Sequence, residues 1–326
     1  MEIQKIFKDF NNLKALIVGD VMIDAYYLGK VDRISPEAPV PVVALTKKEN
    51  RMGGAANVAL NIKSLGASPL LCSVIGNDAD AQIFKHLLNE NGLDDSGIVS
   101  STERQTTVKT RVIGNNHQML RIDQEITDLL NPEEEDQLLE KVANLLPQAD
   151  VLIFSDYDKG VLTPKVIEQI IALCKQQNIP TVADPKKRNF LAYNGVSLFK
   201  PNLKELADGL KTMPIKPESD TISNAIIQLQ QQMPHQISMI TLSEHGVYYS
   251  VNDQKSIIPA HLRTIADVSG AGDTVISVAS LCLALNLPAE RIVQLSNLAG
   301  GLVCEYLGVV PIKKEQLLEE AIQHHL

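Results

Sequence analysis

Long hydrophobic runs are missing from this sequence. No stretch reaches the roughly 18 consecutive apolar residues that a membrane-spanning helix needs, and the opening MEIQKIFKDFNNLK has no apolar segment typical of a secretory signal. The four cysteines, Cys72, Cys174, Cys282 and Cys304, lie far apart and form no C-x-x-C pair. We therefore expect reduced, buried thiols in a cytoplasmic protein.

An excess of basic residues is absent as well. The 326 residues include 30 Lys and Arg against 39 Asp and Glu, which gives a net charge of -9. This balance argues against non-specific nucleic-acid binding. No G-x-G-x-x-G follows the first expected strand, which disfavours a dinucleotide-binding oxidoreductase. A site for anionic phosphates would have to concentrate its cations locally or use a metal ion.

Hydrophobic residues make up 44% of the chain and charged residues 21%, as in a globular protein with a sizeable core. Short apolar segments alternate with helical patterns, after a short amphipathic helix over 3–10. This alternation predicts a mostly parallel sheet with helices on both faces. The strands are expected over 13–20, 68–74, 149–154, 179–184 and 237–242, and the clearest helices over 163–178, 271–286 and 288–308.

Two segments, 21–48 and 103–122, break this alternation and are expected to be extended. The second contains a hairpin pattern with a Gly-Asn-Asn turn. Pro36, Pro39 and Pro41 would each remove a hydrogen-bond donor from a central strand. We therefore expect both segments to form a small β-layer, or lid, within a single domain spanning 1–326.

The strongest local motif runs from Asp267 to Asp273 and leads directly into a helix. Gly270, Ala271 and Gly272 leave backbone N–H groups uncovered at the helix N-terminus, where an anion is favoured. A carboxylate beside a phosphate site would repel the phosphate, so Asp273 is better explained as a base that accepts a proton from an attacking hydroxyl. The alternative is an ordinary loop with an aspartate at a helix start.

Two weaker motifs accompany it. Gly53-Gly54 permits close backbone approach, and Asn57 begins a helix rich in small residues; a plain turn before a packed helix is the alternative. Asn202 and Glu205 follow a strand-to-helix junction, where a helix-capping box would explain both.

Together these motifs resemble the PfkB (ribokinase-like) family of carbohydrate kinases over essentially the whole chain. The resemblance implies a three-layer α/β/α fold with a β-lid, and ATP-dependent phosphorylation of a sugar hydroxyl. Asp273 would be the catalytic base, and the backbone amides of residues 270–273 would form the anion hole for the transferring phosphoryl group. The residues that match the first family signature are Gly53, Gly54, Asn57, Ala59, Gly66 and Gly76, and 267–273 matches the second.

The resemblance also implies roles for residues in other segments. Asn202 and Glu205 correspond to an N-x-x-E motif that organises Mg²⁺ and the ATP phosphates, largely through water. Asp267 and Ser269, with Gly308, correspond to a monovalent-cation site that would take K⁺. The remaining positions implied for ATP are Thr241, Ser243 and Gly246 near the ribose and phosphates, and Asn297 beside the adenine. Two residues depart from the family pattern: Val278 stands where a small residue is expected, and Ser243 where many members have glycine.

Residues 19–43 are similar to the opening of bacterial D-glycero-β-D-manno-heptose 7-phosphate kinases. Similar strings occur at 119–125, 155–160 and 183–186. This similarity implies phosphorylation of the anomeric hydroxyl of the heptose 7-phosphate to give the 1,7-bisphosphate, on the route to ADP-heptose. With no H-x-G-H-like segment after the kinase, the stand-alone form is expected. The alternatives are a PfkB kinase for another sugar phosphate, such as fructose 1-phosphate, or a non-catalytic sugar- or nucleotide-binding regulator.

Sugar hydroxyls pair with short acids and amides. In the family that the chain resembles, the segments of Asp20 and Asp24 and of Gly53, Gly54 and Asn57 converge on the sugar, so the resemblance implies that these residues contact it. Structural caps are the alternative for the two aspartates.

A phosphate on the sugar also needs cations. The candidates on lid and loop segments are Lys109, Arg111, Arg121, Lys159 and Lys186. Arg121 and Lys186 are favoured because they stand in the subfamily-like strings, and each is a solvated surface charge in the alternative account.

The lid is also expected to have an apolar face made by Val40, Val42, Val108 and Val112. In a monomer this apolar face would be exposed to solvent. We therefore expect a homodimer in which two lids pack together and help close the sugar site.

Overall fold

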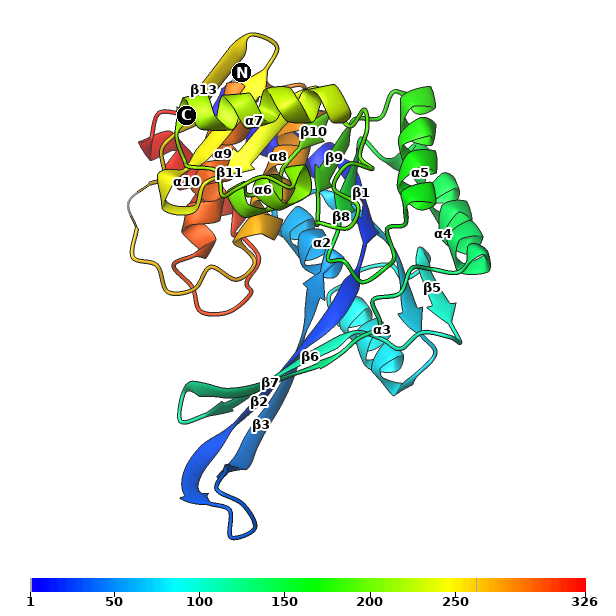
Figure 1. Ribbon diagram of the computed structural model, residues 1–326, viewed down its shortest axis with the longest axis vertical. Helices are drawn as coiled ribbons and strands as arrows, with labels where there is room; N and C mark the ends of the chain where they lie inside the picture. The colour runs from blue at the N-terminus through cyan, green and yellow to red at the C-terminus, as the bar shows by residue number, and fades with distance from the viewer. Residues whose placement is uncertain (1, 262) are drawn as a thin grey trace.

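The computed structural model describes residues 2–261 and 263–326 of the chain. A nine-stranded sheet carries helices on both faces, and a four-stranded sheet extends away from it (Figure 1). The helices are α1 Ile3–Asp9, α2 Ala55–Ser64, α3 Ala79–Glu90, α4 Pro132–Leu145, α5 Pro164–Gln177, α6 Leu203–Leu210, α7 Ser219–Gln232, α8 Ala271–Ala284, α9 Ala289–Val303 and α10 Lys314–Gln323. The strands are β1 Lys14–Gly19, β2 Val21–Ile34, β3 Pro41–Gly54, β4 Ser68–Gly76, β5 Ile98–Ser101, β6 Val108–Gly114, β7 His117–Gln124, β8 Val151–Ser155, β9 Thr181–Asp184, β10 Leu198–Phe199, β11 Ile237–Thr241, β12 Val247–Val251 and β13 Gln254–Ile258.

The main sheet has the strand order β13-β12-β11-β10-β9-β8-β1-β4-β5. Every neighbouring pair from β5 to β11 is parallel, while β12 and β13 add an antiparallel edge. The expected mostly parallel sheet is thus confirmed, and β1, β4, β8, β9 and β11 match the five expected strands. The helix expected over 288–308 is too long: α9 ends at Val303, and the chain turns through Gly308 at a φ of +73°.

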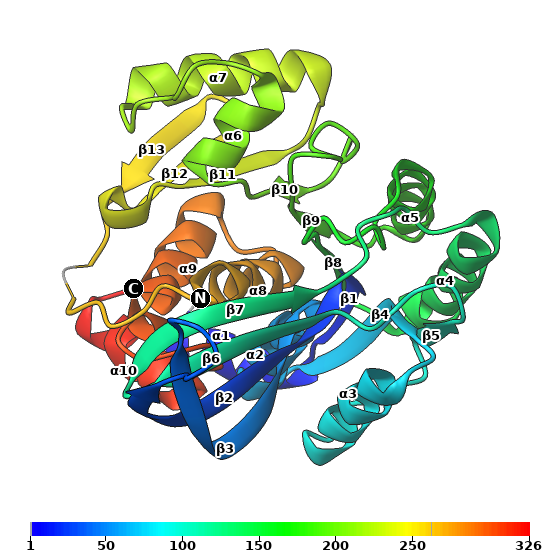
Figure 2. The same ribbon diagram turned by 60° about the horizontal axis from the view of Figure 1, so that its bottom comes forward.

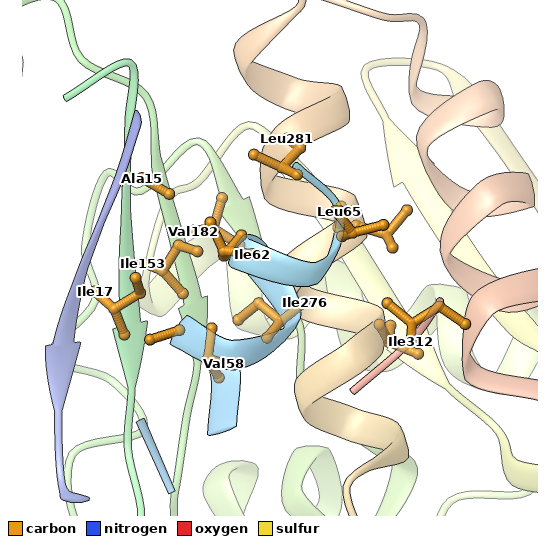
Figure 3. Packing of buried hydrophobic residues seen from close by; sticks show 14 of the residues in the cluster. Ala15, Ile17, Val58, Ile62, Leu65, Ile153, Val182, Ile276, Leu281 and Ile312 are labelled. Atoms are coloured by element: carbon orange, nitrogen blue, oxygen red, sulfur yellow. The ribbon is translucent and has the colours of Figure 1, made fainter. Parts of the chain in front are cut away.

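Alternating residues of β1 explain why both faces of the sheet are covered. Ala15 and Ile17 point into a core shared with α2, α8 and α9, where Ile62 and Ile276 pack (Figure 3). Leu16 and Val18 point into the opposite core, built with α4, α5, α6 and α7. All four cysteines are free and buried, as expected from the sequence.

The four-stranded sheet is the expected lid, with the order β3-β2-β6-β7 (Figure 2). The predicted hairpin is β6–β7; Asn115 and Asn116 turn it with φ values of +51° and +65°, the left-handed geometry of tight hairpin turns. Residues 36–40 lie between strands, and Pro41 begins β3 at the end of its pairing with β2, so no proline interrupts the ladder.

One boundary of the lid differs from the prediction. β3 continues to Gly54, beyond the expected end at residue 48, and pairs with the start of β2. The two glycines therefore end a strand instead of making a loop. A Cβ on Gly53 would lie 2.3 Å from a carboxylate oxygen of Asp24, so the absence of a side chain permits this close pairing.

Ile62 tests how strongly α2 is held on the sheet. It is fully buried in the core of Figure 3, so Ile62→Ala should lower the free energy of unfolding by about 2–5 kcal/mol through lost burial and a residual cavity. Urea unfolding followed by circular dichroism would measure this. The matched control Ile227→Ala, at a 56% exposed site on α7, should change stability by no more than about 0.5 kcal/mol. Equal effects of the two variants would contradict the packing described.

Candidate active site

The carboxylate of Asp273 lies in the first turn of α8 and is 7% exposed. Asn57, at the start of α2, donates its side-chain N–H to one carboxylate oxygen at 2.6 Å. The hydroxyl of Tyr157, in the loop after β8, donates to the other oxygen. Burial raises the pKa of Asp273 to about 6, and nearby Asp184 adds to the rise, against the opposing hydrogen bonds of Tyr157 and Asn57. A buried carboxylate with this pKa can accept a proton near neutral pH.

Buried polar contacts fix α2 against α8 behind this carboxylate. Asn61 accepts a hydrogen bond from the hydroxyl of Thr274 at 3.0 Å and donates to the backbone carbonyl of Asn57 at 2.9 Å. Val278, where the family signature expects a small residue, is fully buried in the core beside these contacts. The side chain at this departure from the signature is therefore part of the core packing of α8.

The turn before Asp273 provides an open space. Gly270 has a φ of +80°, which favours glycine, and caps α8. A Cβ on Gly272 would meet nothing closer than an Asp184 carboxylate oxygen at 3.8 Å and the Lys200 ammonium at 4.0 Å. The N–H of Ala271 donates to the carbonyl of Val268 at 3.3 Å, so this predicted anion-hole donor has a partner within the protein.

Two lysines lie on the sheet side of that space. Lys200 is 3% exposed and pairs with Asp184 at 3.0 Å. Lys186 pairs with Glu205, and its ammonium lies 5.9 Å from the centre of the Tyr157 ring. Burial alone would lower the pKa of Lys186, but Asp184 and Glu205 hold it above the ordinary value, so this side chain stays charged.

Asn202 and Glu205 form the capping box that was the structural alternative. Asn202 accepts from the Glu205 N–H, and one Glu205 oxygen accepts from the Asn202 N–H, both at 2.8 Å. The other oxygen of Glu205 faces Lys186, so capping α6 does not use up the carboxylate. Asn202 also bridges to Thr241, and both line a cleft of about 800 Å³ that includes Ser243. That volume is in the range of small-molecule sites.

The loop after β11 requires unusual backbone angles. Ser243 has a φ of +54°, which explains why glycine is common at this position in the family. Gly246 has a φ of +90°, and a Cβ there would lie 2.0 Å from the carbonyl oxygen of Ile258. Asn297, on α9, donates to the carbonyl of Pro259 at 2.8 Å, just beyond the end of β13.

Asp267, Ser269 and Gly308 are brought together as the resemblance implied. One Asp267 oxygen accepts from the backbone N–H and the hydroxyl of Ser269, at 3.0 and 2.9 Å, and the other accepts from the Gly308 N–H at 3.0 Å. Partial burial favours the neutral acid, but these hydrogen bonds outweigh it and lower the pKa of Asp267, which is therefore an anion at neutral pH.

Asp20 and Asp24 have different surroundings. Asp20 is 1% exposed and accepts backbone N–H groups from Tyr157 at 2.8 Å, Val161 at 3.0 Å and Lys159 at 3.2 Å, so its contacts are those of a structural cap. Asp24 pairs with Arg111 at 2.6 Å under the lid. The expected sugar contact of each aspartate stays a prediction.

The sequence-indicated cations are all paired with carboxylates. Lys109 contacts Asp123 at 3.1 Å and Glu125 at 3.0 Å, and Lys159 contacts the other Glu125 oxygen at 2.8 Å. Arg121, on the exposed edge strand β7, pairs with Asp123 at 2.9 Å.

Three residues of the site were not indicated by the sequence reasoning: Tyr157, Asp184 and Lys200. Each follows or ends a parallel strand, β8, β9 or β10, and the carboxyl ends of parallel strands meet at one edge of a sheet. Tyr157 lies inside the similar string 155–160 and Asp184 inside 183–186, so these two strings were a usable signal. Among residues 2–261 and 263–326, no three or more His, Cys, Asp or Glu side chains cluster as a metal site. Within the same residues, none of the helices has the length and hydrophobicity to cross a membrane.

Solved structures with the same architecture include kinases. Phosphofructokinase-2 from Escherichia coli in complex with potassium aligns with a TM-score of 0.79 at 19% identity, over 96% of this chain and 100% of its own. Ribokinase from Arabidopsis thaliana, complexed with ribose and ATP, aligns with a TM-score of 0.73 at 16% identity, over 94% and 99% of the two chains. These likenesses confirm the ribokinase-like three-layer fold.

Curated relatives found by sequence share a higher identity with this chain than these solved structures do. The Bifunctional protein HldE of Geotalea uraniireducens is 37% identical over 99% of this chain and 66% of its own length. That of Methylobacillus flagellatus is 39% identical over 94% and 62%. The chain thus spans just under two thirds of these relatives. The model of the pfkB family carbohydrate kinases matches residues 12–315. With this match and the buried carboxylate at the glycine turn, the chain belongs to the pfkB family of carbohydrate kinases and is a sugar kinase.

Proposed function

We propose that this kinase transfers the γ-phosphoryl group of ATP to the anomeric hydroxyl of D-glycero-β-D-manno-heptose 7-phosphate. The observation that carries the phosphoryl transfer is the Asp273 carboxylate beside the open turn at Gly272 and Lys200. The choice of sugar rests on residues 19–43, which resemble heptose 7-phosphate kinases. These residues form β2 and the start of β3, which make up one side of the lid and include Asp24.

The chemistry follows from where the charges lie. Ionised Asp273 accepts the proton of the acceptor hydroxyl, whose oxygen then forms a bond to the γ-phosphorus while the bond to the ADP oxygen breaks. The negative charge on the transferring group would be met by the amides at the start of α8 and by Lys200. Lys186, beside Glu205, is placed to meet phosphates on the nucleotide side.

The nucleotide side also fits Mg²⁺. Magnesium usually keeps several waters and is held by one or two carboxylates together with substrate phosphates. Glu205 and Asp184 both lie close to Lys186, and they are the carboxylates that would hold the ion, largely through water. When bound, the ion would offset phosphate charge. For a monovalent cation such as K⁺, we propose the anionic loop at Asp267 and Ser269; the similar phosphofructokinase-2 was solved with potassium.

Asp273→Asn should lower turnover by about 100-fold or more, because the amide keeps the size of the side chain but cannot accept the proton. ATP should still bind. ADP release measures turnover and calorimetry measures nucleotide affinity. The matched control Asp220→Asn removes an aspartate from the first turn of α7, away from the site, and should leave turnover unchanged. Near wild-type turnover of Asp273→Asn would refute the base assignment.

The phosphate end of the sugar needs its own cations. Lys109 and Lys159 converge on the two oxygens of Glu125, so two ammonium groups already surround one anion. Lys159 is two residues from Tyr157, and Lys109 lies opposite Asp24 in the lid. A dianionic phosphate could replace Glu125 between them. We therefore propose Lys109, with Lys159, for the phosphate of the substrate. They replace the expected Lys186, which we assign to the nucleotide side because it pairs with Glu205; Arg121 remains a candidate that the same assay can rank.

Lys109→Ala should lower kcat/KM for heptose 7-phosphate by about 10- to 100-fold, the effect of one charge-assisted contact. It should change the value for unphosphorylated heptose by less than about threefold and leave the KM for ATP unchanged. The control Lys165→Ala removes a lysine that also bridges two carboxylates, Glu135 and Asp136, on the body of the protein. Equal losses on both sugars, or better wild-type activity on fructose 1-phosphate, would count against the proposed substrate.

The lid leaves apolar side chains exposed, which supports the homodimer. Val108 of the expected apolar face is buried in the protein's own core, so it is not available to a partner. Val42 and Val112 of that face are half-buried, and Val40 is exposed. The other exposed large apolar residues described in the lid are Ile34, Leu45, Met119, Leu120 and Ile122. Every residue of the edge strand β7 is exposed. We propose that a second copy covers this surface, and that the protein is cytoplasmic, in keeping with its free thiols.

Leu120→Lys combined with Ile122→Lys should convert the dimer to a monomer, because both side chains lie on one face of β7 and are more than half exposed. Sedimentation at micromolar concentration would measure the mass. The control Ile227→Lys places one such charge at an equally exposed site on α7 and should leave the dimer intact. A wild-type protein that sediments as a monomer would contradict the proposal.

A further inference from the structure

Tyr157 connects the catalytic carboxylate to the end of β8. Its hydroxyl donates to Asp273, and the Lys186 ammonium lies over its ring. Burial and the Asp273 carboxylate raise the pKa of Tyr157 well above its ordinary value. The phenol therefore keeps its proton throughout the neutral range and acts as a donor to Asp273.

Hydrogen bonds from its backbone fix the loop that carries Tyr157. The carboxylate of Asp20 accepts three of its backbone N–H groups, from Tyr157, Lys159 and Val161. Gly160 has a φ of +91°, and a Cβ there would lie 1.9 Å from the Asp128 carbonyl oxygen. The loop thus has little freedom, and the phenol is held on Asp273 by the backbone as well as by its own hydrogen bond.

The charges around Asp273 do not by themselves favour its ionised form. Burial and the negative charge of Asp184 raise the pKa of Asp273, while the positive charge of Lys200 lowers it. Asn57 and Tyr157 supply the direct hydrogen bonds. The titratable or charged groups that face Asp273 or Tyr157 from the neighbouring elements are Asp24, Asp184, Lys186 and Lys200.

We propose that Tyr157 is a positioning residue that keeps the buried Asp273 carboxylate ionised and oriented as a base. The inference rests on the proposed role of Asp273. Without the phenol, one carboxylate oxygen loses its partner in a poorly hydrated site, and the protonated acid becomes more stable.

The protein contains a matched second pair. Tyr193 is fully buried and donates to Asp156 at 2.8 Å, one residue before Tyr157. Burial and the nearby Asp20 raise the pKa of Asp156 to about 6, close to that of Asp273. Tyr193→Phe thus removes a similar hydrogen bond from a carboxylate of similar pKa that does not touch the acceptor site.

The test compares kcat/KM between pH 5 and 9 for the wild type, Tyr157→Phe and Tyr193→Phe. The same substrates are used throughout, so their own phosphate titrations cancel. The hydrogen bond from Tyr157 lowers the pKa of Asp273. Its loss in Tyr157→Phe should therefore shift the acid limb of the pH profile, where kcat/KM falls with decreasing pH, to higher pH by roughly one unit. Activity should fall about fivefold at pH 6 and less than about twofold at pH 8. Tyr193→Phe should leave the limb in place.

Three results would overturn the proposal: an equal loss at pH 6 and pH 8, no shift, or a shift with Tyr193→Phe alone, which would assign the limb to Asp156. If Tyr157→Phe does not fold, 3-fluorotyrosine at position 157 gives the same test in a nearly unchanged protein. Its phenol is a stronger donor, so the acid limb should move downward, and an unmoved limb would refute the role. Failure of Asp273→Asn to lose turnover would instead refute the base itself, so the two failures are distinguishable.

Discussion

A carboxylate held away from water between two neutral donors sets the requirements for the rest of this site. The base role that we propose for Asp273 uses a buried carboxylate whose pKa is near neutral, yet burial disfavours the ionised form that would accept the proton. Asn57 and Tyr157 offset part of that cost from two other segments of the chain. The fold must therefore bring α2, α8 and the loop after β8 together within hydrogen-bond distance.

The parallel sheet achieves this because its strands end at one edge. β8, β9 and β10 lead directly to Tyr157, Asp184 and Lys200, and the glycine turn of α8 faces them. The lid carries Asp24, a residue of the proposed sugar side, paired to Arg111. Asp20 has a supporting part in this arrangement, since it holds the loop of Tyr157 by its backbone.

The sequence predicted those parts of the fold and of the site that depend on local patterns of residues. Apolar periodicity located β1 and α8, and the glycine turn indicated Asp273 as the candidate base, which stays a prediction. Local patterns do not predict pairing between distant residues. Gly53 was assigned to a turn, but it pairs with Met22 in the lid and lies against the Asp24 carboxylate. Tyr157 is 116 residues from Asp273 in the chain, and no spacing rule connects them. The capping box at Asn202 was foreseen, but its coexistence with the Lys186 contact of Glu205 needed the structure.

We propose that the protein phosphorylates the anomeric oxygen of a sugar that already carries a phosphate. This can be followed by ³¹P NMR of the reaction of wild-type enzyme with ATP and D-glycero-β-D-manno-heptose 7-phosphate. We expect a second sugar phosphorus signal, coupled to the anomeric proton, to grow as ADP forms while the 7-phosphate signal persists. ADP formation without that signal, or with phosphorylation at another carbon, would contradict the proposal.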